Sequence, residues 1–277
     1  MAYLFDLGVA GRSPLTILSY QQALQDLARF LEAAGVHDFT QVSVNELREY
    51  LSGLQAAKLK PSTIRTRCTI LSCFFNWLLQ ENAIVANPMT RIRRPKKPDR
   101  HRQAFCIGEI VNIVKAAGSS RNPLRDTAII LLFLDCGLRL SELSALRPND
   151  YDPVTSILLI KGKGSKLRAL NMGQRCRRTL EAQLETTNGS VWGIKRGGIR
   201  DLIRRLGKKA GTKATPVKFR RTFADRFLAA GGGLDELQYL MGHSSISTTM
   251  IYAAAGQEAR ALRSHADHSP VDRLPLV

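Results

Sequence analysis

The chain has 277 residues and 44% of them are hydrophobic, enough for one large domain or two ordinary ones with real cores. Its formal net charge of +18 lies entirely beyond residue 90: residues 1–90 hold seven basic and seven acidic side chains, and residues 91–277 hold 34 and 16. A charge needed only for solubility would be spread evenly, so this distribution favours a polyanionic partner, above all nucleic acid.

Three helices are predicted in residues 1–90. The first ends before Gly35. The second begins at a capping box formed by Ser43 and Glu46, and the third opens at Pro61. Their apolar stripes are Tyr20, Leu24, Leu27 and Leu31; then Leu47, Tyr50, Leu51 and Leu54; then Ile64, Cys68, Leu71, Phe75 and Leu78.

Basic residues surround the start of the third helix with no acid among them. They are Lys58, Lys60, Arg65 and Arg67. We expect this end of the helical domain to face the polyanion, and a solvated helix end explains these four residues alone equally well.

A basic strip follows the helices. Residues 91–102 contain seven Lys or Arg and two prolines, which keep the strip extended. Because folded patterns resume on both sides, we interpret it as a tether along a phosphate backbone and not as a tail. Its candidate DNA contacts are Arg93, Arg94, Lys96 and Lys97. The predicted organisation is a helical domain over 1–90, a linker over 91–103, and a second domain with a C-terminal tail over 104–277.

The second domain has mixed patterns. Ile107–Ala117 predicts an amphipathic helix, and Leu124–Asp135 predicts a buried helix that Gly137 ends. Ser156–Ile160 and Leu167–Leu170 predict a β-hairpin. Helical patterns continue beyond it, so the predicted fold class is mainly α with a small antiparallel hairpin or sheet.

Two arginines are candidate phosphate ligands. Arg139 stands between a helix-ending glycine and a short helix that starts near Ser141, where a side chain can point into a cleft. The planar guanidinium fork suits a phosphate, and a structural salt bridge with Glu142 is an equal alternative. Arg220 lies in the first turns of a helix that begins at Thr215, where backbone amides also favour anions.

The tip of the hairpin holds a lysine. Lys163 stands between Gly162 and Gly164, and glycines allow a close approach to a ligand. Lysine can lose its proton, so Lys163 is either a general acid or, with Lys166, a phosphate-positioning group. The spacing does not match a nucleotide-binding P-loop.

The last candidates follow Gly242. His243 has no Cys or His at metal-ligand spacing, so no metal is expected there; it is a phosphate donor, a proton shuttle or a satisfied core histidine. Tyr252 stands nine residues later, and a lone helical tyrosine usually packs. Together with two arginines and a lysine, however, these groups suit a metal-free attack on a DNA phosphodiester.

Neither a membrane segment nor a disulfide framework is expected. The longest strictly apolar run, Ala128–Leu134, is too short to span a bilayer, and Asp6 interrupts the apolar start. The five cysteines include no C-x-x-C pair, and most lie in apolar runs; they are Cys68, Cys73, Cys106, Cys136 and Cys176. We predict buried, reduced thiols in an intracellular protein.

Taken in order, the motifs of the second domain resemble those of the tyrosine site-specific recombinases, the phage-integrase and Xer-type family. The resemblance covers nearly the whole chain, and its final box is the most specific. The matching boxes are Gly137-Leu138-Arg139-x-Ser141-Glu142-Leu143, then Gly162-Lys163-Gly164-x-Lys166, then the helix with Arg220, and last Gly242-His243-Ser244 through Thr248-Thr249-x-Ile251-Tyr252.

The resemblance implies a SAM-like core-binding domain and a catalytic domain that form a C-shaped clamp around double-stranded DNA with inverted-repeat core sites. It implies a homo-tetramer on paired sites, no membrane, no metal and no cofactor, in the cytoplasm of a bacterial, phage or mobile-element host. Tyr252 would form a 3′-phosphotyrosine. Arg139, Arg220 and His243 would neutralise the charge on the phosphate, and Lys163 would protonate the leaving 5′ oxygen.

One box departs from the family pattern. The family's second box usually reads Thr-Pro-His-x-Leu-Arg-His-Thr-Phe, and this chain has Val217 and Arg221 at the two histidine positions. Valine cannot donate a hydrogen bond, and losing one such donor costs other enzymes roughly a hundredfold in rate. A catalytically weakened DNA-binding relative is therefore the first alternative to a recombinase. A type IB-like topoisomerase is the second, since it shares the tyrosine chemistry.

Overall fold

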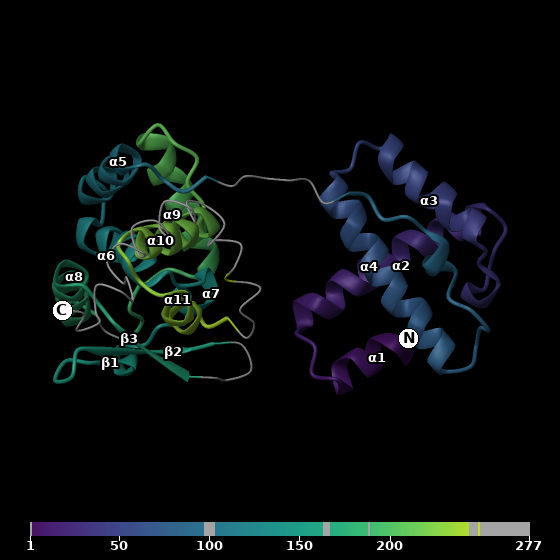
Figure 1. Cartoon of the computed structure of the whole chain (residues 1–277), viewed down its shortest axis with the longest axis horizontal. Helices are drawn as coiled ribbons and strands as arrows, with labels where there is room; N and C mark the ends of the chain where they lie inside the picture. The colour runs from purple at the N-terminus through teal and green to yellow at the C-terminus, as the bar shows by residue number, and fades with distance from the viewer. Residues whose placement is uncertain (1, 97–102, 163–166, 188, 244–248, 250–277) are drawn as a thin grey trace, which may run out of the picture. The chain divides into compact units, whose positions relative to one another are not determined.

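The computed structural model describes residues 2–96, 103–162, 167–187, 189–243 and 249, which form two compact units (Figure 1). The units comprise Met1–His101 and Arg102–Val277, and each is described by itself. Four predicted functional residues lie outside the described ranges: Lys97, Lys163, Lys166 and Tyr252.

The first unit is helical. Its elements are α1 (Ala2–Val9), α2 (Pro14–Ala33), a 3-10 turn (Phe39–Gln41), α3 (Val44–Ala56), α4 (Pro61–Gln80) and a second 3-10 turn (Pro88–Arg91). The three predicted helices are confirmed, and both halves of the Ser43–Glu46 capping box are present. The eight-residue α1 was not among the predicted helices. Tertiary contacts hold it: the rings of Tyr3 and Phe74 lie 5.3 Å apart, and Trp77 Nε1 donates to Asp6 Oδ2 at 2.7 Å.

The second unit contains helices and one small sheet. Its elements are α5 (Ile107–Gly118), α6 (Pro123–Cys136), α7 (Leu140–Ser144), a 3-10 turn (Pro148–Asp150), β1 (Tyr151–Asp152), β2 (Ile157–Lys161), β3 (Leu167–Asn171), α8 (Gln174–Glu185), α9 (Arg196–Lys209), α10 (Pro216–Ala229) and α11 (Leu234–Met241). The strands pair antiparallel in the order β1-β2-β3, with Leu159 opposite Ala169. The predicted hairpin is confirmed; β1 is only two residues long and carries no periodicity.

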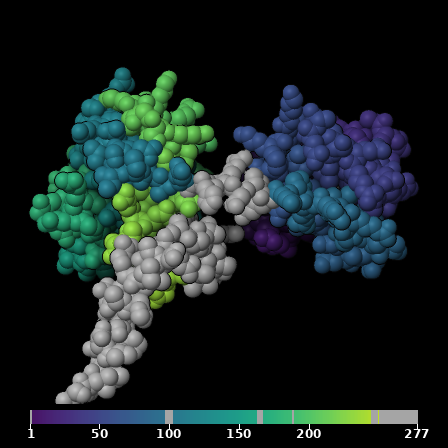
Figure 2. All heavy atoms as spheres, turned by 45° about the horizontal axis from the view of Figure 1, so that its top comes forward, coloured from purple at the N-terminus to yellow at the C-terminus, as the bar shows by residue number. Residues whose placement is uncertain are grey.

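The core of this unit joins segments that are distant in sequence. The ring of Phe219 lies 4.8 Å from that of Phe105 and 5.7 Å from that of Phe133, which fixes the start of α10 against α6. Trp192 Nε1 donates to Leu143 O at 2.6 Å and so holds α7. Figure 2 shows α5, in blue, beside the green α9–α10 segment on the surface of the unit.

Gly137 ends α6 with φ +57°, in the left-handed region that favours glycine. A Cβ at this position would lie 2.3 Å from Phe223 Cδ1. The residue is therefore required twice, once for the turn and once for the close approach of α10. The turn directs the chain immediately into Arg139.

The prediction of buried thiols is only partly right. Cys68, Cys136 and Cys176 are buried, but Cys73 and Cys106 are exposed, because Cys73 lies on the outer face of α4 and Cys106 caps α5. Among the helices built from described residues, none combines the length and apolarity needed to cross a bilayer.

Candidate active site

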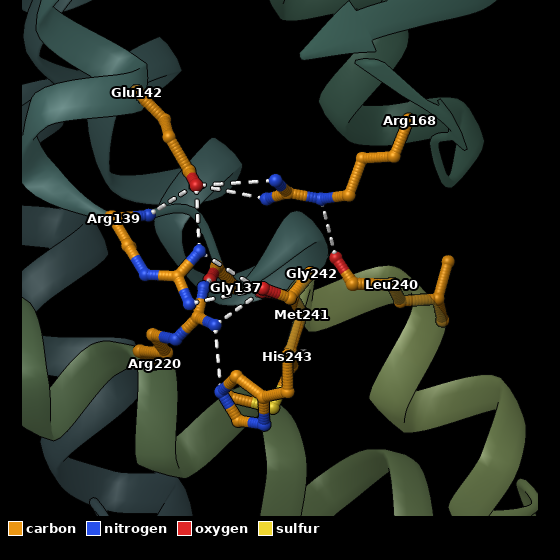
Figure 3. Close-up of polar contacts among 9 residues, drawn as sticks. All are labelled: Gly137, Arg139, Glu142, Arg168, Arg220, Leu240, Met241, Gly242 and His243. Carbon is orange, nitrogen blue, oxygen red and sulfur yellow. Dashed lines mark hydrogen bonds and ion pairs between the residues drawn. The ribbon is translucent and has the colours of Figure 1, made fainter. Parts of the chain in front are cut away.

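The fold brings three of the predicted residues together from distant segments. Arg139 precedes α7, Arg220 lies in the first turns of α10, and His243 follows the end of α11 (Figure 3). Helix packing explains the convergence, because Phe223 of α10 packs with Leu237 and Met241 of α11. The predicted partners Lys163 and Tyr252 are not among the residues described.

A buried carboxylate organises the arginines. Glu142 Oε1 accepts from Arg139 Nη1 at 2.8 Å, and Oε2 accepts from the Arg139 backbone N–H at 2.8 Å. Arg168 of β3 donates to the same carboxylate from Nη1 at 3.1 Å and from Nη2 at 2.8 Å. The side chains of Glu142 and Arg168 are only 4% and 6% exposed. Burial alone would raise the pKa of Glu142, but the hydrogen bonds from Arg168 and Arg139 hold it below its ordinary value.

Three guanidinium groups bind the last carbonyls of α11. Arg168 Nε donates to Leu240 O at 2.9 Å, and Arg139 donates to Met241 O and Gly242 O, both at 3.2 Å. Arg220 donates to Met241 O from Nη2 and to Gly137 O from Nη1. A helix C-terminus leaves carbonyls unsatisfied and carries partial negative charge, so cations are favourable there. The site is thus assembled around the end of α11.

His243 contacts Arg220 on one ring nitrogen and Thr249 on the other. The Nε2 atom lies 3.0 Å from Arg220 Nη2, and Nδ1 lies 2.8 Å from Thr249 Oγ1. A guanidinium can only donate, so Nε2 accepts and the ring proton belongs on Nδ1, which donates to the buried Thr249 hydroxyl. Arg220 therefore selects the tautomer of His243, and Thr249 accepts the remaining ring proton.

The histidine is neutral in this arrangement. Burial, followed by the charges of Arg220, Arg139 and Arg168, lowers the pKa of His243 from 6.5 to about 4. A neutral ring beside Arg220 avoids a direct repulsion between two cations.

Arg139 is only partly engaged by the protein. Its side-chain hydrogen bonds to described residues come from Nη1 and Nη2, and none of them comes from Nε. The side chain is 38% exposed. The predicted salt bridge with Glu142 is confirmed, and the binding of phosphate by Arg139 stays a prediction.

Sequence reasoning missed two residues of this site. Arg168 carries no motif of its own, and its only signal is a charge at an inward-facing position of the predicted strand that ends in Leu170. Thr249 falls within the final box, but hydroxyl residues are common at helix starts, so the contact with His243 was not predictable.

The box that departs from the family pattern forms the start of α10. Val217 is 54% exposed and stands three residues before Arg220, on the same side of α10. Lys218 points elsewhere: its Nζ lies 3.0 Å from Glu109 Oε1 and 4.1 Å from the centre of the Phe105 ring. Arg221 pairs with Asp225, with 3.5 Å between Nε and Oδ2. Neither neighbouring cation replaces the missing histidine.

The candidate DNA contacts of the first unit divide into two groups. Arg67 pairs with Asp26 at 2.6 Å, Arg65 Nη1 donates to Pro95 O at 3.0 Å, and Arg94 Nη2 donates to Ser72 Oγ at 3.1 Å. Exposed positions are held by Lys58, Lys60, Arg93 and Lys96.

Comparison with known families gives consistent matches. Residues 107–258 match the phage integrase family, and residues 2–82 match the phage integrase N-terminal SAM-like domain. The tyrosine recombinase XerC of Xanthomonas campestris pv. campestris (strain B100) is 31% identical over 249 residues, covering 86% of this chain and 77% of that protein. The tyrosine recombinase XerC of Bacillus pumilus (strain SAFR-032) is 30% identical over 280 residues, covering 93% and 91%.

Solved structures share the fold. A lambda integrase(75-356) dimer bound to a COC' core site superposes with a TM-score of 0.73 at 19% identity, covering 89% of this chain and 94% of that one. The Tn1549 transposon integrase in complex with a circular intermediate DNA gives a TM-score of 0.76 at 18% identity, covering 94% and 97%.

The depressed pKa of His243 predicts a pH dependence of folding. Between about pH 4 and pH 6.5 the unfolded chain binds a proton at this position and the folded chain does not. The free energy of unfolding therefore has its highest value above pH 6.5 and decreases as the pH drops towards 4. Urea denaturation of the wild type and His243→Gln across this range should show the smaller loss in the variant. Parallel pH profiles would contradict the assignment.

Removing the Thr249 hydroxyl should leave the Nδ1–H of His243 without its acceptor. We expect Thr249→Val to lower the free energy of unfolding by about 1–3 kcal/mol, the typical cost of an unsatisfied buried donor. Thr249→Ser keeps the oxygen and serves as the matched control, with a loss at least twofold smaller. Equal losses in urea denaturation would show that packing, and not the hydrogen bond, makes Thr249 important.

Proposed function

Since this chain belongs to the phage integrase family, we propose that Arg139, Arg220 and His243 bind the scissile phosphate of its DNA substrate. The chain is a tyrosine site-specific recombinase, and the family cleaves and rejoins DNA through a tyrosine. The observation that carries the assignment of residues is their convergence. Arg139 and Arg220 share the carbonyl of Met241 as an acceptor, and Arg220 reaches His243 at 3.0 Å.

The charge of the site supports this assignment. In the transition state a pentacoordinate phosphorane gathers negative charge on its non-bridging oxygens, and preorganised cations stabilise that charge more strongly than that of the ground state. Arg139 and Arg220 are held by Glu142 and by backbone carbonyls before any substrate arrives. They need no reorganisation when the charge develops.

The proposed reaction is a transesterification. The hydroxyl oxygen of Tyr252 forms a bond to phosphorus while the bond from phosphorus to the 5′ oxygen breaks, which gives a 3′-phosphotyrosine. Lys163 supplies the proton that the 5′ oxygen takes up. A 5′ hydroxyl of the partner strand then reverses the step, so the number of phosphodiester bonds is conserved and no ATP is consumed.

The neutral histidine indicates how His243 takes part. In the free protein Nε2 accepts from Arg220, so it has no proton to offer a phosphate oxygen. We propose that the incoming phosphate draws the Arg220 hydrogen to itself. Its negative charge raises the pKa of His243 and favours a proton on Nε2, and His243 then becomes a donor to the phosphate.

DNA is the partner, as the DNA complexes among the structural neighbours support. We propose residues 1–90 as the core-binding domain, 91–103 as the linker, and 104–277 as the catalytic domain with its tail. The exposed Lys58, Lys60, Arg93 and Lys96 are the proposed phosphate contacts of the first two segments. We also propose a homo-tetramer on paired inverted-repeat sites, acting in the bacterial cytoplasm where such DNA lies.

The decisive test is a covalent complex. On a nicked suicide DNA duplex that carries the recombination site, the wild type should form a protein–DNA adduct that survives denaturing electrophoresis. Tyr252→Phe should form none, because the attacking oxygen is absent. An equal band from the variant, or no band from the wild type, would reject the proposal. Relaxation of plasmids that lack paired sites would instead identify a topoisomerase.

Restoring the missing donor should speed cleavage. Val217 is exposed beside Arg220, so a histidine there can reach the same phosphate. We expect Val217→His to raise the single-turnover cleavage rate by up to about a hundredfold, the usual worth of one such donor. Ala229→His, near the other end of α10, is the control and should leave the rate unchanged. An unchanged or slower rate in Val217→His would show that this pocket no longer uses a second donor.

A further inference from the structure

Three potential metal ligands lie close together near the end of α6, just before Gly137 and Arg139. A carboxylate oxygen of Asp135 and the Sγ atoms of Cys136 and Cys176 all lie within 4.8 Å of one another. Asp135 and Cys136 end α6, and Cys176 lies in the first turn of α8. We propose that this cluster binds one thiophilic divalent cation of the Zn²⁺ class.

The ligand chemistry matches such a cation. Zn²⁺ takes thiolate and carboxylate ligands in tetrahedral geometry, with Zn–S bonds of roughly 2.3 Å, so bound sulfurs lie roughly 3.8 Å apart. The cluster needs to contract by no more than about 1 Å to reach that spacing. On binding, the cation displaces one proton from each thiol, and a water molecule completes the fourth position.

The ligands are held in place by the fold. Cys136 and Cys176 are 2% and 4% exposed, so their side chains are fixed by packing in the core. Asp135 Oδ2 accepts from the backbone N–H of Gly173 at 2.8 Å, which aims the carboxylate at the start of α8. A Cβ at Gly173 would lie 3.3 Å from Asp135 Oδ1, so glycine gives the carboxylate its room.

A cavity gives access to the cluster. About 350 Å³ in volume, it is lined by Asp135, Cys136, Gly173 and Arg226, among others. Two thiolates and one carboxylate around a divalent cation carry a net charge of −1. The guanidinium of Arg226 on the cavity wall compensates this charge.

A disulfide is the competing fate of two adjacent thiols. A carboxylate oxygen of Asp135 lies within the same 4.8 Å as the two sulfurs. A carboxylate is a ligand for a cation and has no part in a disulfide. The geometry therefore favours the metal.

The bound cation would fix the position of the turn at Gly137. Cys136 directly precedes Gly137, whose carbonyl accepts from Arg220, and it stands three residues before Arg139. A cation that ties the end of α6 to the start of α8 fixes the turn from which both arginines are held. It stabilises the site and does not take part in the phosphoryl transfer.

Titration of the full chain with Co²⁺ under reducing conditions tests the site, because thiolate ligation produces a sulfur-to-cobalt charge-transfer absorption. We expect one Co²⁺ per chain, displaced by Zn²⁺, and loss of the absorption in Cys136→Ser and in Cys176→Ser. The exposed cysteines give matched controls: Cys73→Ser and Cys106→Ser should retain the full absorption.

Asp135→Asn tests the site even if the substitutions at the buried Cys136 and Cys176 unfold the protein. Asp135 is only partly buried, and the variant should keep the absorption but bind Co²⁺ at least tenfold more weakly. No absorption in the wild type, its persistence in the Cys136 and Cys176 variants, or unchanged affinity in Asp135→Asn would overturn the proposal. So would recovery of the reduced wild type with a mass two hydrogens lower after brief exposure to air, which would show a disulfide. Covalent trapping through Tyr252 is independent of every one of these readouts.

Discussion

The buried carboxylate of Glu142 is the constraint on which the site depends. At 4% exposure it must be ionised and fully paired, since an isolated buried charge costs several kcal/mol. Arg139 and Arg168 supply that pairing from opposite sides, one from the start of α7 and the other from β3. The carboxylate thereby fixes the distance between the sheet and the helix that carries the first candidate phosphate ligand.

The same arginines also terminate α11. The carbonyls of Leu240, Met241 and Gly242 each accept from a guanidinium, and those guanidiniums come from β3, α7 and α10. Gly242 follows with φ +59°, and a Cβ there would lie 2.8 Å from Arg168 Nη1. Side chains from three other elements therefore hold the backbone just before His243. The position of His243 thus depends on the correct packing of all three elements.

Patterns among neighbouring residues predicted the helices and turns better than they predicted the contacts between residues of the site. The capping box at Ser43, the stop at Gly137 and the hairpin follow from residues close together in sequence, and all are confirmed. Arg168 and Thr249 were missed because their roles depend on partners 26 and 6 residues away. The thiol cluster was missed for the same reason: Cys136 and Cys176 stand 40 residues apart, and only the packing of α6 on α8 joins them.

Each candidate phosphate-binding arginine has a second duty, and this changes how its substitution should be interpreted. Arg220 holds Gly137 O and Met241 O, so any neutral replacement leaves buried carbonyls without donors as well as removing a charge. Lysine would keep the charge but has no planar fork to span two carbonyls and a phosphate together. Loss of activity in an arginine variant thus mixes binding with misplacement of His243. Val217, which is exposed and holds none of the carbonyls at the end of α11, separates the two effects: a change there alters the donors to the phosphate while the end of α11 stays in place.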